Sequence, residues 1–356
     1  MPTLFDPITY GSIEARNRFV MAPLTRSRAG DSRIPNDLMA QYYAQRASAG
    51  LIVSEATAIS EQGFGWYGAP GIYEDTHIEG WKKTTKAVHD KGGKIVLQLW
   101  HMGALSHPDF QDDGQTVGPS VIQPQGSAHV KEGEKPYAPS RALSLEEIKA
   151  TVQDYATAAT RAIAAGFDGV EIHGANGYLI DQFLKNGTNK RDDEYGGSIE
   201  NRCRFALEVI EAVIAAIGAD KTSIRLSPNV PNGGISDSDP LSLLTYLGDR
   251  LNAFDLAFVH IHEGLRGGEK PAPWVSGKFR EIYKGKLILN GNYNQETAET
   301  AMANNETDAM AFGKAFIANP DLPERFQKNA PLNKPDVKTF YAGGPEGYID
   351  YPSLAA

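Results

Sequence analysis

Short runs of apolar and β-branched residues recur along the whole chain, and each is followed by a stretch in which apolar residues have helical spacing. We count eight such runs in the 356 residues, at 19–23, 51–56, 95–100, 169–173, 223–226, 257–262, 286–289 and 309–312. Strands that alternate with helices favour a parallel sheet, because a helical crossover returns the chain to the same edge. Eight such units without an internal sequence repeat predict a (β/α)8 barrel, also called a TIM barrel.

Two of the expected helices carry clear signals at both ends. Ser144 and Glu147 have capping-box spacing ahead of an amphipathic run at 148–165, and Gly166 follows that run. A second amphipathic run, at 199–217, is followed by Gly218. Both helices therefore lie where an α/β barrel requires them, before the fourth and fifth expected strands.

Three segments lie outside the repeating units. Within residues 1–18, the runs 5–8 and 13–17 flank Tyr10-Gly11, which predicts a β-hairpin that caps the bottom of the barrel. Residues 107–141 form a long insertion after the third strand, rich in Gly, Pro, Gln and Asp, and we expect it to form a rim or lid of the active site. The aromatic tail 331–356 is expected to pack back on the barrel. We expect one domain over residues 1–356.

The composition excludes several classes of protein. A single cysteine, Cys203, cannot form an intrachain disulfide or supply a cysteine-ligated cluster or zinc site. A net charge of -9 without a basic run argues against nucleic acid as a partner. No apolar run approaches the roughly 20 residues of a membrane span, and the first residues do not resemble a signal peptide. We therefore expect a cytoplasmic protein with a small-molecule partner, as a monomer or homodimer.

Chemically useful side chains gather at the carboxyl ends of the expected strands, where barrel enzymes build their active sites. His173, Asn176 and Tyr178 follow the fourth strand and combine two hydrogen-bonding groups with a proton donor. That grouping suits a site that binds a carbonyl oxygen through hydrogen bonds and protonates a nearby atom. The remaining groups at these strand ends are Pro23, Leu24, Thr25, Ala56, Gln98, Trp100, Arg225, His260, His262, Gly291, Asn292, Gly313 and Lys314.

Several of these groups together indicate a mononucleotide-like cofactor across the barrel mouth. Glycines after the seventh and eighth strands allow backbone N–H groups to approach a phosphate, and Lys314 adds positive charge. Gln98 can both donate to and accept from the edge of a heterocycle, and Arg225 can stabilise a developing anion. Trp66 and Trp100 offer flat apolar walls.

The sequence resembles the old yellow enzymes, which are FMN-dependent ene-reductases, along nearly its whole length. The matching motifs are MAPLTR at 21–26, QLWHMG at 98–103, NKRDDEYGGS at 189–198 with ENR at 200–202, IRLSP at 224–228 and FGKAFIANPDL at 312–322. The ending, with TFY at 339–341 and DYP at 350–352, is similar to the bacterial N-ethylmaleimide and glycerol trinitrate reductases.

This resemblance implies an NAD(P)H-dependent reduction of α,β-unsaturated carbonyls, maleimides, nitro compounds and nitrate esters. Hydride would pass through flavin N5, His173 and Asn176 would hold the substrate oxygen, and Tyr178 would donate the proton. For FMN it implies contacts from Pro23, Leu24, Thr25, Ala56, Gln98, Arg225, Gly291, Asn292, Gly313 and Lys314. For the substrate pocket it implies Trp66, Trp100 and Tyr341.

Three positions depart from the family pattern. Lys314 stands where many relatives have Arg, and it keeps the charge but loses the bidentate fork. Gly174 stands where Ala is usual, which gives the backbone more freedom. Trp66 replaces a frequent Tyr, which removes a hydroxyl and adds bulk near the substrate.

Two other functions are compatible with parts of the sequence. His260 and His262 lie on one face of a strand, as the ligands do in metal-dependent barrel hydrolases, although no companion carboxylate or lysine cluster is evident. A barrel that binds a phosphate ligand without turnover is the other alternative. Without the family motif, His173 could be a structural histidine at a strand end, Tyr178 a packing residue and Lys314 a solvated loop lysine. The motif favours the functional role of each.

Overall fold

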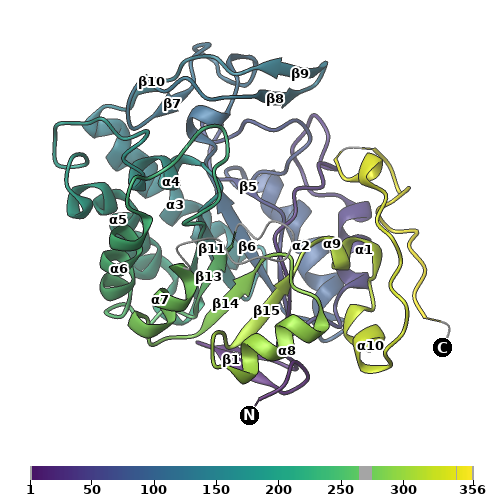
Figure 1. Ribbon diagram of the computed structural model, residues 1–356. Helices are drawn as coiled ribbons and strands as arrows, with labels where there is room; N and C mark the ends of the chain where they lie inside the picture. The colour runs from purple at the N-terminus through teal and green to yellow at the C-terminus, as the bar shows by residue number, and fades with distance from the viewer. Residues whose placement is uncertain (1, 264–274, 342, 355–356) are drawn as a thin grey trace.

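The computed structural model describes residues 2–263, 275–341 and 343–354, and it shows a closed barrel of eight parallel strands (Figure 1). In barrel order the strands are β3 (Phe19–Met21), β4 (Leu51–Val53), β6 (Ile95–Trp100), β11 (Gly169–Gly174), β12 (Thr222–Leu226), β13 (Phe258–His262), β14 (Leu287–Asn290) and β15 (Ala309–Phe312). The barrel closes because β15 pairs in parallel with β3 and β11 pairs in parallel with β6. The predicted (β/α)8 barrel is confirmed.

Helices follow the strands and cover the outside of the barrel (Figure 1). Helix α3 starts one turn earlier than the apolar pattern alone suggests, because Ser144 accepts from the N–H of Glu147 and the Glu147 carboxylate accepts from the N–H of Ser144. The helices are α1 (Asp37–Gln45), α2 (Asp75–His89), α3 (Leu145–Ala164), α4 (Leu179–Leu184), α5 (Ile199–Ile217), α6 (Pro240–Leu251), α7 (Val275–Ile282), α8 (Gln295–Ala303), α9 (Lys314–Ala318) and α10 (Leu322–Gln327).

The interior of the barrel changes from apolar to polar along the strands. Its lower part is an apolar cluster that joins barrel residues to the N-terminal hairpin; it includes Ile8, Tyr10, Ile13, Val20, Leu51, Val96, Phe258, Ile288 and Ala309. Toward the carboxyl ends, inward positions carry buried polar side chains, among them Gln98, Glu171, Arg225 and His260. Burial of polar groups is costly unless they are paired, so this end of the barrel is built for chemistry rather than for stability.

The N-terminal hairpin consists of β1 (Ile8–Tyr10) and β2 (Ile13–Ala15), and Tyr10 packs edge-on against Phe258 at 5.4 Å between ring centroids. The first strand begins later than the predicted 5–8, because Leu4–Asp6 form a turn in which the Asp6 carboxylate accepts from the N–H of Thr3 at 2.6 Å. In the turn between the strands, Gly11 has φ of 55° and no room for a Cβ beside the Asp220 carbonyl.

The insertion after β6 contains regular structure rather than a bare loop. Strands β8 (Ser127–Val130) and β9 (Gly133–Pro136) form an antiparallel hairpin, while β7 (Val117–Gly118) pairs in parallel with β10 (Arg141–Ala142). Figure 1 shows these four strands at the top, at the opposite end from β1. A further two-residue strand, β5 (Thr57–Ala58), extends the sheet beside β6.

The C-terminal tail lies along α1 and α9 (Figure 1) and is held mainly through its backbone. Arg26 and Arg28 both donate to the carbonyls of Thr339 and Phe340, and Arg26 also donates to the carbonyl of Gly347. Tyr348 is fully buried and stacks on Tyr42 with ring centroids 4.1 Å apart. These contacts fix the part of the tail that approaches the barrel mouth.

None of the helices in the three described ranges combines the length and the apolar character that a membrane crossing requires.

Candidate active site

A cavity of about 710 Å³ opens at the carboxyl ends of the barrel strands. Most residues that the sequence analysis singled out line this cavity, although they come from distant parts of the chain. They are Pro23, Leu24, Thr25, Trp66, Asn176, Tyr178, Arg225, Gly291, Asn292, Gly313, Lys314 and Tyr341. Of the residues that the family resemblance assigns to FMN, substrate or catalysis, the other four are Ala56, Gln98, Trp100 and His173, which are buried and do not line the cavity directly.

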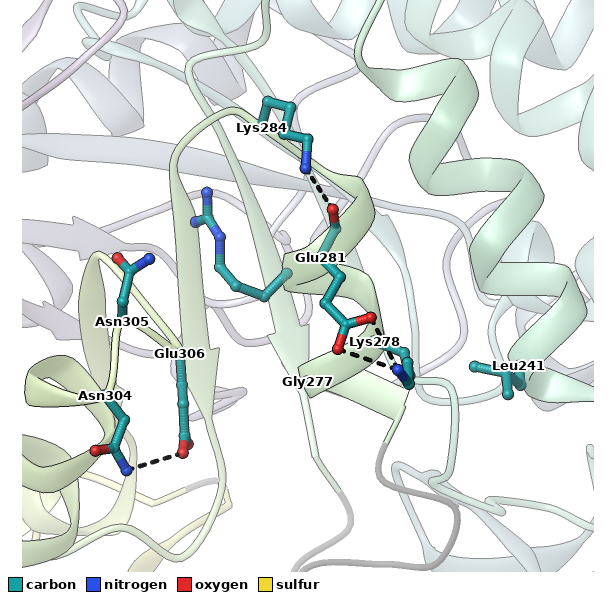
Figure 2. Close-up of a pocket in the computed structure, with 9 residues that line it drawn as sticks. Leu241, Gly277, Lys278, Glu281, Lys284, Asn304, Asn305 and Glu306 are labelled. Carbon is teal, nitrogen blue, oxygen red and sulfur yellow. Dashed lines mark hydrogen bonds and ion pairs between the residues drawn. The ribbon is translucent and has the colours of Figure 1, made fainter.

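A larger hollow of about 820 Å³ lies on the outside of the barrel between α7 and the segment after α8 (Figure 2). Two of its charged side chains form an ion pair, with Lys278 2.8 Å from Glu281, and the uncharged Asn304 donates to Glu306. None of the residues expected at a site lines this hollow, so we place the candidate site at the barrel mouth.

His173 is a neutral hydrogen-bond donor in this site. Its Nδ1 accepts from the N–H of Ala175 at 3.3 Å, so in the neutral ring Nε2 carries the hydrogen. Burial, with the charge of Arg225, holds the pKa of His173 well below its usual range. The imidazole therefore stays uncharged at neutral pH and can donate from Nε2.

Asn176 is fixed by its backbone in a conformation that few residue types adopt. Its φ is 57°, in the left-handed region that Asn tolerates better than most residues. Its N–H donates to Ser227 Oγ at 2.6 Å, and its carbonyl accepts from Asn232 Nδ2 at 2.9 Å. This turn directs the chain from β11 into α4 and leaves the Asn176 side chain at the cavity.

Tyr178 precedes α4 and packs between two aromatic rings. Its ring centroid lies 5.0 Å from that of Trp100 and 4.9 Å from that of His173, both in edge-on geometry. Burial raises the pKa of Tyr178 well above its usual value, and the nearby phenols of Tyr137 and Tyr341 add to this effect. The phenol therefore keeps its proton at neutral pH and can act as a proton donor.

Beneath the cavity, polar side chains from different strands form two hydrogen-bonded groups. Glu171 accepts from Gln98 Nε2 at 2.7 Å and lies 2.7 Å from His260 Nδ1. Arg225 donates from one terminal nitrogen to Asn290 Oδ1 at 2.7 Å. The sequence analysis missed Glu171, yet it lies two residues before His173 on β11 and so faces the same side of that strand.

Arg225 retains a donor that the described protein atoms leave unpaired. Its Nε is buried and has no hydrogen-bond partner within the described ranges. Burial lowers the pKa of Arg225 to about 10, which still leaves the guanidinium charged at neutral pH. A buried donor without a partner is costly, so this group fits a site where a ligand supplies the acceptor.

Comparison with family models gives a match over residues 3–333 to the NADH:flavin oxidoreductase / NADH oxidase family. The chain belongs to this family. The solved structures that match the chain include an old yellow enzyme homologue, in agreement with the sequence motifs. The chain is therefore an oxidoreductase of a flavin-dependent family, and its fold is that of the solved structures it matches.

Relatives and structural neighbours of this family member match nearly end to end. A probable flavin mononucleotide-dependent alkene reductase from Leishmania infantum is 45% identical, covering 99% of this chain and 97% of the relative. 12-Oxophytodienoate reductase 1 from Oryza sativa subsp. japonica is 44% identical, with 99% and 93% covered. The old yellow enzyme homologue from Zymomonas mobilis superimposes with a TM-score of 0.97 at 49% identity, over 99% and 100% of the two chains. Morphinone reductase in complex with tetrahydroNAD gives 0.95 at 47% identity, over 100% and 98%.

The family match and the site geometry do not support the alternative of a metal-dependent hydrolase. His260 Nδ1 pairs with Glu171, whereas His262 Nδ1 lies 2.8 Å from Asn176 Oδ1, so the two rings are committed to different partners. Within the described ranges, no group of three or more His, Cys, Asp or Glu side chains is arranged to hold a metal ion. Two histidines on one strand face are a weak signal because a metal site also needs ligands from elsewhere.

Trp66 lines the cavity and contacts both the insertion and the tail. Trp66 lies 5.3 Å from His129 of β8 and 5.2 Å from Tyr341 of the tail, measured between ring centroids. Tyr341 is 50% exposed, so its ring lies at the entrance. The sequence analysis missed His129, because nothing in the local pattern of the insertion shows which of its residues turns toward the barrel.

We expect His101 to make this family member less stable in mild acid. Burial lowers the pKa of His101 to about 3, so below pH of about 6.5 the unfolded chain binds a proton that the folded chain rejects. Stability is therefore lost as pH falls, by about 2 kcal/mol from this residue at pH 5. Urea unfolding at pH 7 and pH 5 measures the loss.

His101→Asn isolates this contribution, because an Asn oxygen can still accept from the N–H of Gly103, as His101 Nδ1 does at 3.1 Å. The variant should lose about 2 kcal/mol less than the parent between the two pH values. Equal losses in the two proteins would show that His101 does not titrate differently in the folded state.

Proposed function

We propose that residues 1–356 form a single-domain, FMN-dependent ene-reductase that uses NADPH or NADH as reductant in the cytoplasm. Its substrates are activated alkenes, namely α,β-unsaturated carbonyls, maleimides and nitro compounds, together with nitrate esters. The observation that carries this proposal is that Asn176 and the protonated phenol of Tyr178 line one cavity, while the neutral His173 packs against Tyr178 with ring centroids 4.9 Å apart. Alkene reductases and morphinone reductase among the relatives support it.

The residues around the cavity fit FMN. The unpaired Nε of Arg225 matches an acceptor on a heterocycle edge. Gln98 donates to Glu171, and the charge of Glu171 also acts on Arg225. Gly313 and Lys314 stand at the start of α9, where the first backbone N–H groups have no partner within the helix. These N–H groups and the Lys314 charge suit a phosphate. Thr25, Pro23 and Leu24 line the same cavity, and Leu24 lies next to Gly313 because β3 pairs with β15.

In the proposed reaction the protein binds the substrate oxygen and delivers a proton. Donors from His173 and Asn176 withdraw electron density through the carbonyl or nitro group, which makes the β-carbon electrophilic. When bound, FMN supplies the hydride that this carbon receives. Tyr178 then donates its proton to the neighbouring α-carbon, and its raised pKa keeps that proton in place until a strong base forms.

The visible spectrum of the purified protein under anaerobic conditions tests this function. We expect a yellow protein that loses its colour with NADPH and regains it with excess 2-cyclohexenone. A colourless preparation that also fails to take up FMN would contradict the cofactor assignment. A protein that is bleached by NADPH but never regains colour with an enone, a maleimide or a nitroalkene would keep the cofactor and reject ene-reduction.

A further inference from the structure

We propose that His262 is a positioning residue that orients the Asn176 amide toward the substrate. This inference deepens the proposed function and rests on it. His262 Nδ1 lies 2.8 Å from Asn176 Oδ1, although the two residues are 86 positions apart in the chain. Both side chains line the same cavity, His262 from β13 and Asn176 from the turn after β11.

The backbone of Asn176 is held, but its amide can still turn. Ser227 and Asn232 bind the main-chain N–H and carbonyl, and neither contact restrains the side chain. Rotation of the amide by half a turn exchanges its oxygen and its NH2 group, which have opposite hydrogen-bonding character. The donor that the substrate oxygen requires is present in only one of these two orientations.

His262 selects that orientation when its Nδ1 carries the hydrogen. An Nδ1–H bonded to Asn176 Oδ1 turns the NH2 group away from His262 and leaves it available to a substrate oxygen. His262 is neutral in the folded protein, because burial and the charges of Arg225 and His260 keep its pKa well below the usual range. A neutral ring has one N–H, so the bond to Asn176 also fixes the tautomer of His262.

The two histidines of β13 thus have separate partners. His260 is fully buried and its Nδ1 pairs with the Glu171 carboxylate beneath the cavity. His262, two residues later on the same strand face, reaches the cavity and pairs with the carboxamide of Asn176 instead. Its position in the cavity wall is therefore suited to adjusting a substrate-binding group rather than the barrel interior.

A double-mutant cycle with His262→Leu and Asn176→Ala tests the inference, with return of the flavin colour on adding 2-cyclohexenone as the readout. We expect His262→Leu to slow this step about tenfold, as for the loss of one orienting hydrogen bond. The double variant should be no slower than Asn176→Ala alone, because His262 acts only through Asn176. His262→Gln should recover part of the rate since its amide can donate to the same oxygen, and exposed His89→Leu on α2 is the matched control.

Losses that multiply in the double variant, or an unchanged rate in His262→Leu, would overturn the inference. If His262→Leu unfolds, as its urea midpoint would reveal, His262→Met takes its place, and the contrast between Met and Gln decides. Failure of the proposed function has a different signature, because the unsubstituted protein would then lack flavin or fail to regain colour with any of the alkenes tested above.

Discussion

Replacing Tyr178 with Phe is expected to slow the return of flavin colour with 2-cyclohexenone by a factor of about 10² to 10⁴, the usual contribution of a positioned general acid. The ring stays in its place between Trp100 and His173, because the substitution removes only the hydroxyl. Bleaching by NADPH should change little, since that step needs no proton from the phenol. Stopped-flow absorbance of each half-reaction separates the two effects.

Tyr246→Phe, on the outer helix α6, is the matched control for the Tyr178 experiment, because it removes a phenol that lies outside the cavity. Both half-reactions should keep their rates in this control. If Tyr178→Phe slows reduction and reoxidation equally, the phenol shapes the cavity instead of donating a proton. If the rate of reoxidation does not change, the proton must come from another group or from water.

Replacing Arg46 with Met is expected to lower the free energy of unfolding by about 3–5 kcal/mol. Arg46 is fully buried and donates to the carbonyls of Tyr42, Phe316 and Ile317 at 2.7–2.8 Å, with its guanidinium 3.8 Å from the Tyr42 ring centroid. Met fills similar space but leaves these carbonyls without their donors. Because Phe316 and Ile317 belong to α9, which starts beside Gly313, FMN should also be lost more readily.

Urea unfolding at equilibrium and the flavin content after gel filtration measure the two effects of Arg46→Met. Arg250→Met, at an exposed position in α6, is the control and should change stability by no more than about 0.5 kcal/mol. A stability loss as small as that of the control would show that water replaces the guanidinium at these carbonyls. A large stability loss with normal flavin content would show that the contacts of Arg46 with α9 stabilise the fold but do not affect the cofactor site.

The barrel could be predicted from the sequence because its strands are buried on both faces and appear as continuous apolar runs. The segments 95–100 and 309–312 have the predicted bounds, and other strands differ by a few residues at their ends. Features that lack an apolar signal were not predictable. Strand β5 has two residues, and the β9 segment Gly133–Pro136 is polar, so neither stands out from a loop.

The candidate site was predictable as a set of residue types at strand ends, but not as a set of contacts. The barrel rule places residues such as Gln98 and Arg225 together without stating their partners. Glu171 and His129 escaped notice because partner choice depends on side-chain direction and on the path of the insertion. The pairing of His262 with Asn176 was likewise invisible, and the strand-face pattern alone had suggested a metal site instead.

Arg26 and Arg28 hold the tail segment 339–340 through main-chain oxygens, and this has a consequence for evolution and for protein engineering. Arg26 and Arg28 bind the carbonyls of Thr339 and Phe340, which every amino acid provides. The side chains at 340 and 341, which line the cavity, are therefore uncoupled from the attachment that holds them there. Substitutions at positions 340 and 341 can therefore change the shape of the entrance while the tail stays attached. This short segment is a suitable target for altering the substrate range.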